Sequence, residues 1–154
     1  TTRLCLQALE ELDGALHGPV LDLGCGTGVL ALAALRLGWP QACAVDPDPD
    51  AIRSSGLSAT ANGLSLEMIE GTLGDLPGRT FSLILGNILL NILLDEMRRL
   101  AVAAAPGATL ILSGILGEQV AELLEAAESH KMTHVRTYEC EDWAAVVLRR
   151  ARRF

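Results

Sequence analysis

The chain has 154 residues, of which 50% are apolar and 20% charged, and its formal net charge is −7. This length and composition predict one folded domain with a single sizeable core and exclude a disordered chain. No apolar run is long enough to cross a bilayer, and Thr1–Arg3 does not open a signal peptide, so we expect a cytoplasmic protein without a membrane segment.

The charge is unevenly distributed along the chain. Four of the twelve basic residues lie among the last six positions, as Arg149, Arg150, Arg152 and Arg153. The remaining chain is therefore strongly acidic and would repel a phosphate backbone except at a local basic patch. We expect a basic, lysine-bearing partner, whereas a nucleic acid is disfavoured as the direct substrate.

Neither the cysteines nor the histidines have metal-ligand spacing. The chain contains four cysteines, Cys5, Cys25, Cys43 and Cys140. They form no C-x-x-C pair, and we expect reduced thiols. His130 and His134 are four residues apart, but they span a predicted helix-to-strand boundary and have no carboxylate at metal spacing. We therefore expect no metal site.

Apolar periodicity and turn residues predict alternating helices and strands in the first part of the chain. The predicted elements are a helix over 2–16, a strand over 20–23, a helix over 27–37, a strand over 42–45 and a helix over 49–62. Gly38 and Pro40 end the second helix. Asp48-Pro49 is typical of an N-cap followed by proline at the first helical position.

The same alternation continues and ends in two strands. The predicted elements are a strand over 64–69, a loop over 71–79, a strand over 81–85, a helix over 89–105, a strand over 109–112, a helix over 118–129 and a hairpin of strands over 133–140 and 143–148. Five alternations followed by a hairpin predict an α/β fold with a mostly parallel, seven-stranded sheet and helices on both faces. Right-handed crossovers then gather the C-terminal strand ends at one edge, where ligands bind.

The most informative stretch runs from Pro19 to Gly28. An apolar strand containing Asp22 leads through Gly24-x-Gly26-x-Gly28 into a helical pattern. A buried strand that delivers a glycine-rich turn to a helix N-terminus is typical of a nucleotide-type ligand site, because a ligand can lie against bare backbone there. The spacing differs from the G-x-G-x-x-G of dinucleotide-binding folds. It resembles the first motif of class I, Rossmann-like methyltransferases that use S-adenosylmethionine, and we expect Gly24 and Gly26 to contact this cofactor.

Two polar residues follow later strands of the predicted sheet. Asp46 ends the second strand, 22 residues after Gly24, where a carboxylate can accept hydrogen bonds from both ribose hydroxyls of an adenosine ligand. A calcium loop starting at Asp46 is excluded, because Ala51 and Leu57 occupy the positions that require glycine and glutamate. Asn87 follows the fourth strand, and its amide can accept from an incoming amine or donate to a ligand carboxylate. A helix-capping role for Asp46 and a turn-capping role for Asn87 remain the simpler alternatives.

Several motifs spread in order along the whole chain resemble the PrmA family of bacterial methyltransferases that modify the ribosomal stalk-base protein. The matching stretches are Thr1-Thr2-Arg3-Leu4-Cys5-Leu6, residues 21–31, residues 45–49, Ala61-Asn62-Gly63, Gly86-Asn87-Ile88-Leu89, residues 112–116 and Glu141-Asp142-Trp143. The resemblance implies cofactor contacts from Thr2, Gly24, Asp46 and Asn87. It also implies methylation of lysine side-chain and N-terminal α-amino groups on a ribosomal protein.

The family carries a His-Pro before its paired threonines and a substrate-recognition domain before that, whereas this chain starts at Thr1. We therefore expect residues 1–154 to be a single S-adenosylmethionine-dependent methyltransferase domain, the catalytic domain only. Asn87 is the expected catalytic residue, orienting either the amine or the methionine end of the cofactor. The alternatives are a methyltransferase of a small molecule or another substrate, and a cofactor-binding domain that is inactive without the recognition domain. A nicotinamide-dependent dehydrogenase is disfavoured by the glycine spacing.

Overall fold

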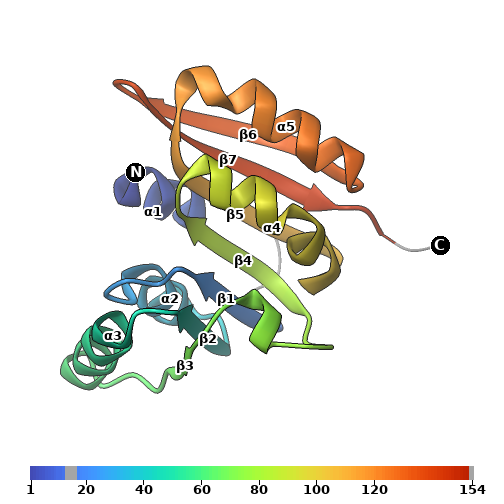
Figure 1. The fold of residues 1–154 in the computed structure, drawn as a ribbon. Helices are drawn as coiled ribbons and strands as arrows, with labels where there is room; N and C mark the ends of the chain where they lie inside the picture. The colour runs from blue at the N-terminus through green and yellow to red at the C-terminus, as the bar shows by residue number, and fades with distance from the viewer. Residues whose placement is uncertain (13–16, 153–154) are drawn as a thin grey trace.

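The computed structural model describes residues 1–12 and 17–152, which form one seven-stranded sheet in the order β3-β2-β1-β4-β5-β7-β6 (Figure 1). The strands are β1 Pro19–Leu23, β2 Gln41–Asp46, β3 Glu67–Glu70, β4 Phe81–Asn87, β5 Ala104–Leu116, β6 Met132–Cys140 and β7 Trp143–Arg150. The first five strands run parallel, and β7 is antiparallel to both β5 and β6. The predicted α/β fold with a C-terminal antiparallel hairpin is confirmed.

Helices cover both faces of this sheet (Figure 1). They are α1 Thr2–Glu10, α2 Val29–Arg36, α3 Pro49–Ala61, α4 Leu90–Ala103 and α5 Val120–Ser129, with short 3₁₀ turns η1 Leu73–Asp75 and η2 Gly117–Gln119. Buried residues of α1, α2 and α3 share one core cluster, and those of α4 and α5 share the other. The central strands supply both clusters in alternation: in β1, Val20 lies in the first and Leu21 in the second. The central strands are therefore apolar on both faces, as parallel strands require.

Helix α1 and strand β3 are shorter than predicted. The first helix, expected over 2–16, ends at Glu10, and positions 13–16 lie outside the described residues. The third strand, expected from Leu64, begins at Glu67, because only Glu67–Glu70 pair with β2. Leu66 is nevertheless buried, so its apolar side chain packs in the core although its backbone does not pair with β2. A 3₁₀ turn, η1, lies within the loop expected over 71–79.

Strand β5 is much longer than the predicted 109–112. We expected Pro106-Gly107 to separate helix and strand, but β5 begins at Ala104 and runs through both residues. Ala104 pairs with Phe81, and the ladder resumes with Thr109 opposite Leu83 after a register shift. Proline lacks the N–H that a ladder needs, and a bulge accommodates it without ending the strand.

Three further observations describe the chain as a whole. No helix in the described ranges is both long and apolar enough to span a bilayer. Within the same ranges, no group of three or more His, Cys, Asp or Glu side chains is placed to hold a metal ion. All four cysteines are free thiols, and of these only Cys140 is exposed.

Candidate functional site

The glycine-rich turn joins β1 to α2 and is held by β2. The backbone N–H groups of Gly24 and Cys25 both donate to the carbonyl oxygen of Val45, at 2.8 and 3.1 Å. Gly24, Gly26 and Gly28 all have positive φ, between 54° and 78°, a region that side chains disfavour. A Cβ placed on Gly26 would meet no atom within 4 Å, so the turn faces open space there.

Two buried polar side chains fix the turn against neighbouring helices. Ser55 of α3, fully buried, donates its hydroxyl to the carbonyl oxygen of Gly26 at 2.9 Å. A Cβ on Gly28 would lie 3.0 Å from the Ser55 oxygen, so this helix packs directly on the turn. Asp22 of β1 accepts a hydrogen bond from the backbone N–H of Ala31 in α2, at 3.0 Å. Together these bonds hold the glycines in one conformation.

Asp22 is 2% exposed and lies behind the turn. Burial raises its pKa to about 7, the hydrogen bond from Ala31 opposes the rise, and the nearby negative charge of Asp46 adds to it. Asp22 therefore has a structural role, joining β1 to the start of α2. Burial also raises the pKa of the Cys25 thiol to about 11, which makes this cysteine a poor nucleophile.

Asp46 lies at the C-terminal end of β2 and is half-buried. Its Oδ2 accepts from the N–H of Gly26 at 3.1 Å, and its Oδ1 accepts from the N–H of Asp48 at 2.9 Å. A carboxylate has about four acceptor positions, so each oxygen retains capacity for a ligand hydroxyl. The helix-capping role that we considered for Asp46 belongs instead to Asp48, whose side chain accepts from the N–H of Asp50 at the start of α3.

Asn87 ends β4, and its side chain meets the start of α1. Its Nδ2 donates to the hydroxyl of Thr2 at 3.1 Å, across 85 positions of sequence. Both residues are half-buried. The Thr2 bond orients the amide and uses one of its two N–H donors, so Oδ1 can accept a hydrogen bond from a ligand and the second N–H can donate one.

The chain beyond Asn87 packs tightly on two glycines. The N–H of Ile88 donates to the carbonyl oxygen of Ser113 at 3.1 Å. A Cβ on Gly114 would lie 2.5 Å from the carbonyl oxygen of Ile88, and one on Gly24 would lie 2.5 Å from the Ile88 side chain. The β4–α4 connection therefore passes between the ends of β1 and β5, and both neighbouring positions require glycine.

A cavity of about 300 Å³ opens beside these strand ends. Its lining comes from the ends of β1, β2 and β3, from η1 and from the start of α4. Gly24 and Asp46 contribute to it, together with the apolar side chains of Leu23, Leu73 and Ile88. A mostly apolar cavity with a few polar groups is typical of a small-molecule site.

The structure brings the predicted site residues to the same edge of the sheet, in two groups. Gly24, Gly26 and Asp46 lie at the ends of β1 and β2, and Thr2 and Asn87 meet at the end of β4. Of these, only Gly24 and Asp46 line the cavity described above. The crossover rule predicted the placement of the glycine turn, Asp46 and Asn87 from the strand ends, whereas Thr2 came only from the family resemblance.

Three cavity residues were missed by the sequence interpretation. Ile88, Ile92 and Glu96 all line the cavity from the β4–α4 segment. Ile92 and Glu96 are four residues apart in α4, which places their side chains on one face of the helix, whereas Ile88 precedes the helix. The spacing indicates a shared face and does not indicate the cavity. Glu96 Oε1 accepts from Arg99 at 2.9 Å, whereas its Oε2 is buried without a hydrogen-bond partner in the described part of the chain.

Comparison with known proteins identifies the chain's relatives. A family model described as ribosomal protein L11 methyltransferase (PrmA) matches residues 1–151. A ribosomal protein L11 methyltransferase of Geobacter metallireducens is 40% identical over 147 residues, which cover 96% of this chain and 48% of the relative. Another, from Geobacter sulfurreducens, is 41% identical over 149 residues, 97% of this chain and 49% of the relative.

Among solved structures, a ribosomal protein L11 methylase from Lactobacillus delbrueckii subsp. bulgaricus superimposes with a TM-score of 0.92 at 27% identity, over 98% of this chain and 79% of that one. The chain thus spans about half the length of the curated relatives that it matches. The family match extends over almost every residue and agrees with the class I fold. The chain belongs to the ribosomal protein L11 methyltransferase (PrmA) family.

Proposed function

We propose that this chain is the catalytic domain of an N-methyltransferase that transfers the methyl group of S-adenosylmethionine to lysine and α-amino groups of a ribosomal protein, L11 in the relatives' names. The observation that carries the proposal is the convergence of Asp46 and the Thr2–Asn87 pair on the glycine-turn edge of the sheet. A ribosomal protein substrate places the enzyme in the cytoplasm. The proposal treats residues 1–154 as one functional domain.

The residues at this edge fit an adenosine-containing cofactor. The open space above Gly26 gives room for a ligand against bare backbone, and Asp46 retains acceptor capacity for ribose hydroxyls. The cavity beside Asp46 offers apolar walls for a purine, and the unpaired Oε2 of Glu96 is an acceptor near it. When bound, the cofactor supplies a methyl group that is already activated on a sulfonium.

The chain's remaining task is to position and deprotonate the amine. An ammonium has no lone pair, and transfer out of water lowers the pKa of a lysine amine without a dedicated base. Asn87 Oδ1 can accept an N–H of that amine and align its lone pair, because Thr2 holds the amide nitrogen. Positioning of this kind accounts for much of the rate enhancement in a displacement between two oriented groups.

A hollow at the same edge supports a cationic substrate. Leu116 and Gly117 at the end of β5 and four carboxylate residues line this hollow, whose volume is about 460 Å³. The four are Glu118, Glu139, Glu141 and Asp142. Because β4 and β5 are parallel neighbours, this acidic hollow lies on the Asn87 side of the sheet. Carboxylates there attract a lysine-bearing protein surface, in agreement with the partner expected from the net charge.

The test is transfer of a labelled methyl group from S-adenosylmethionine to purified L11, with the modified positions located by mass spectrometry. The wild-type chain should label L11 amines, and Asn87→Ala should reduce the rate. Cofactor binding without transfer to L11 would favour the alternative of a domain that needs a recognition region. Transfer only to small amines would contradict the protein substrate.

A further inference from the structure

Basic side chains are concentrated around α4, the segment that leads into β4 and the end of β7. Two adjoining hollows, of about 470 and 570 Å³, open there, and Val102 of α4 lines both. Six of the twelve Lys and Arg residues line them: Arg79, Arg98, Arg99, Lys131, Arg150 and Arg152. Asp95 is the single acidic residue among the described residues that line the two hollows, although the whole chain carries 19. We call these six cations the basic edge.

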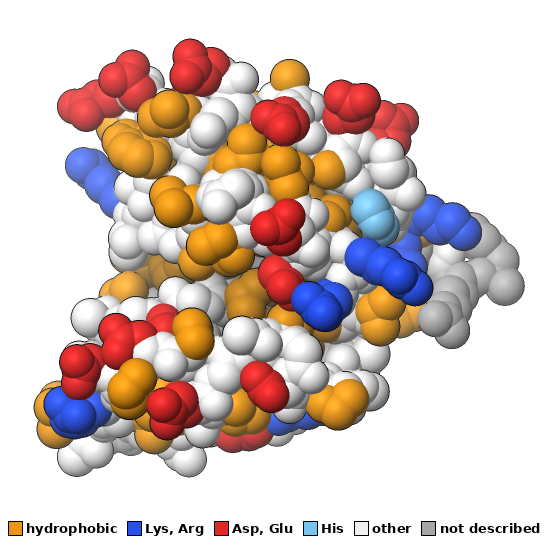
Figure 2. Space-filling view, viewed as in Figure 1, with side chains coloured by type: hydrophobic (Ala, Val, Ile, Leu, Met, Phe, Trp, Pro, Cys, Tyr) orange, Lys and Arg blue, Asp and Glu red, His pale blue; other side chains and the backbone are white. Residues whose placement is uncertain are grey.

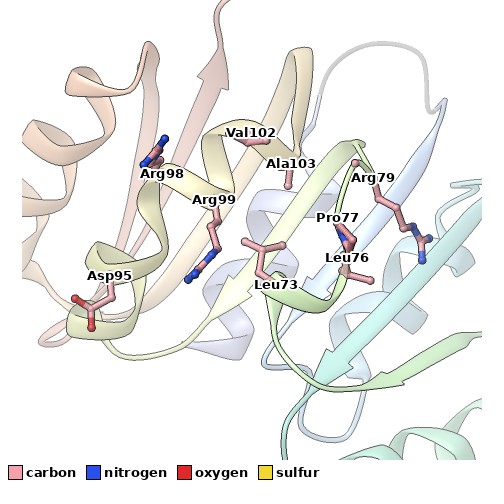
Figure 3. Close-up of a pocket in the computed structure, with 11 residues that line it drawn as sticks. Leu73, Leu76, Pro77, Arg79, Asp95, Arg98, Arg99, Val102 and Ala103 are labelled. Carbon is pink, nitrogen blue, oxygen red and sulfur yellow. The ribbon is translucent and has the colours of Figure 1, made fainter.

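The first hollow lies between α4 and the segment that carries η1. Figure 3 shows Arg98 and Arg99 extending from α4, with Leu73 and Pro77 on the opposite side. Arg99 pairs with Glu96, and the guanidinium of Arg79 pairs with Glu67. Arg98 has no ion-pair partner among the described residues, and it is exposed.

The second hollow lies where β4 and β5 begin and β7 ends. Thr80 just before β4 and Ala104 at the start of β5 flank it, together with Arg150 at the end of β7 and Arg152 beyond that end. Arg150 donates to the carbonyl oxygens of His130 and Lys131, and so needs no carboxylate partner. Neither Lys131 nor Arg152 forms an ion pair within the described ranges. In Figure 2 the Lys and Arg side chains gather on the right, around a histidine, whereas acidic side chains dominate the top.

We propose that the basic edge docks the phosphate backbone of an RNA duplex. Four of its cations lack carboxylate partners among the described residues, in a chain of net charge −7, and a polyanion is the partner that gains most from such a cluster. None of the described residues that line the two hollows is aromatic, so these residues provide no platform for stacking single-stranded bases. Backbone recognition of a duplex needs only cations and shape.

The two hollows lie differently with respect to the candidate site. The second hollow lies where β4 and β5 begin, whereas Asp46 and Asn87 lie where β2 and β4 end. The first hollow adjoins the candidate site, because Leu73 lines both this hollow and the cavity beside Asp46. An RNA held at the second hollow leaves Asp46 and Asn87 free for cofactor and protein substrate. The RNA is a docking partner and not the methylated substrate, which is consistent with the acidity of the rest of the chain.

The test measures fluorescence anisotropy of a short labelled RNA duplex titrated with wild-type chain and two charge variants. Arg98→Glu/Arg152→Glu removes one unpaired cation from each hollow. Arg3→Glu/Arg53→Glu makes the same change in net charge on α1 and α3, outside the basic edge. All four positions are exposed, and circular dichroism checks that each variant folds.

The wild-type chain should bind the duplex at low salt, with a slope of log affinity against log salt of about −3. The basic-edge variant should bind at least tenfold more weakly, with a slope shallower by about 2, and the control variant should stay within about threefold of wild type. Absence of duplex binding at low salt, or equal loss in both variants, would overturn the proposal. Binding to anionic phospholipid vesicles in place of the duplex would also overturn it.

Discussion

Asn87 and Thr2 are joined by a hydrogen bond of 3.1 Å from the amide nitrogen to the hydroxyl oxygen, so the start of α1 sets the orientation of the side chain that ends β4. The two residues lie 85 positions apart. This contact orients the Asn87 amide, and α1 thereby becomes part of the candidate site.

Removal of the Thr2 hydroxyl should weaken cofactor binding through Asn87. Thr2→Val keeps the shape and loses the acceptor, and we expect a 2- to 10-fold lower affinity for S-adenosylmethionine, roughly one neutral hydrogen bond. Asn87→Ala should lower the affinity for S-adenosylmethionine at least as much as Thr2→Val does. If Thr2 acts by holding Asn87, titration calorimetry on the double variant should give about the same affinity as Asn87→Ala alone. Fully additive losses would contradict that coupling.

Replacement of Asp46 by Asn should reduce cofactor affinity strongly. Asn retains one acceptor oxygen but loses the charge, and a hydrogen bond to a charged group contributes about 1.5–3 kcal/mol, or roughly 10- to 100-fold in affinity. Asp48→Asn is the matched control, since Asp48 only caps α3 and Asn is an equally good N-cap. An equal effect of the two substitutions would argue against a ribose contact from Asp46.

Gly26→Ala should still fold, but it should bind the cofactor more weakly than wild type. Its φ of 54° makes a Cβ cost about 1–2 kcal/mol of stability, and the added methyl would occupy space offered to the ligand. Gly63 after α3 is the control, since it also has positive φ and open space around its Cα. Chemical denaturation should show similar losses for Gly26→Ala and Gly63→Ala, and only the former should weaken binding. Unchanged affinity in Gly26→Ala would exclude backbone contact there.

Asp22 should make the chain less stable as pH rises. Its folded pKa, raised to about 7, exceeds the unfolded value of about 3.9, so the folded state binds the proton more tightly. The associated stability is fully present below about pH 4 and is lost as pH rises through about 7. Asp22→Asn can still accept the Ala31 bond and should be more stable than wild type at about pH 8. The denaturation midpoints of both proteins should be measured at about pH 4 and about pH 8. If the difference between variant and wild type were the same at both pH values, the raised pKa would be contradicted.

The sequence predicted the sheet and its ligand edge better than it predicted the element boundaries. Strands such as β4 are recognisable because burial on both faces requires a continuous apolar run, and Gly24 and Asp46 follow from the ends of such runs. Pro106-Gly107 was interpreted as the boundary between a helix and a strand. In the structure β5 runs through both residues, and a register shift between β4 and β5 accommodates them. Pairing with β4, which is distant in sequence, determines where β5 begins, and the local sequence does not predict this pairing.

The candidate site was predictable only in part for the same reason. The Thr2–Asn87 contact joins residues that no local pattern relates, and only family resemblance pointed to Thr2. Glu96 was missed because it occupies an ordinary helical position, and its role depends on the cavity that α4 faces. The basic edge likewise arises only when α4, the segments that precede β4 and β6, and the C-terminal end of β7 come together.

The central claim is that the glycine-turn edge binds S-adenosylmethionine, and calorimetric titration of the wild-type chain tests it most directly, with NAD as the control ligand. We expect saturable binding of one equivalent of S-adenosylmethionine, loss of most of that affinity in Asp46→Asn, and no binding of NAD. Failure to bind S-adenosylmethionine, or comparable binding of NAD, would contradict the claim.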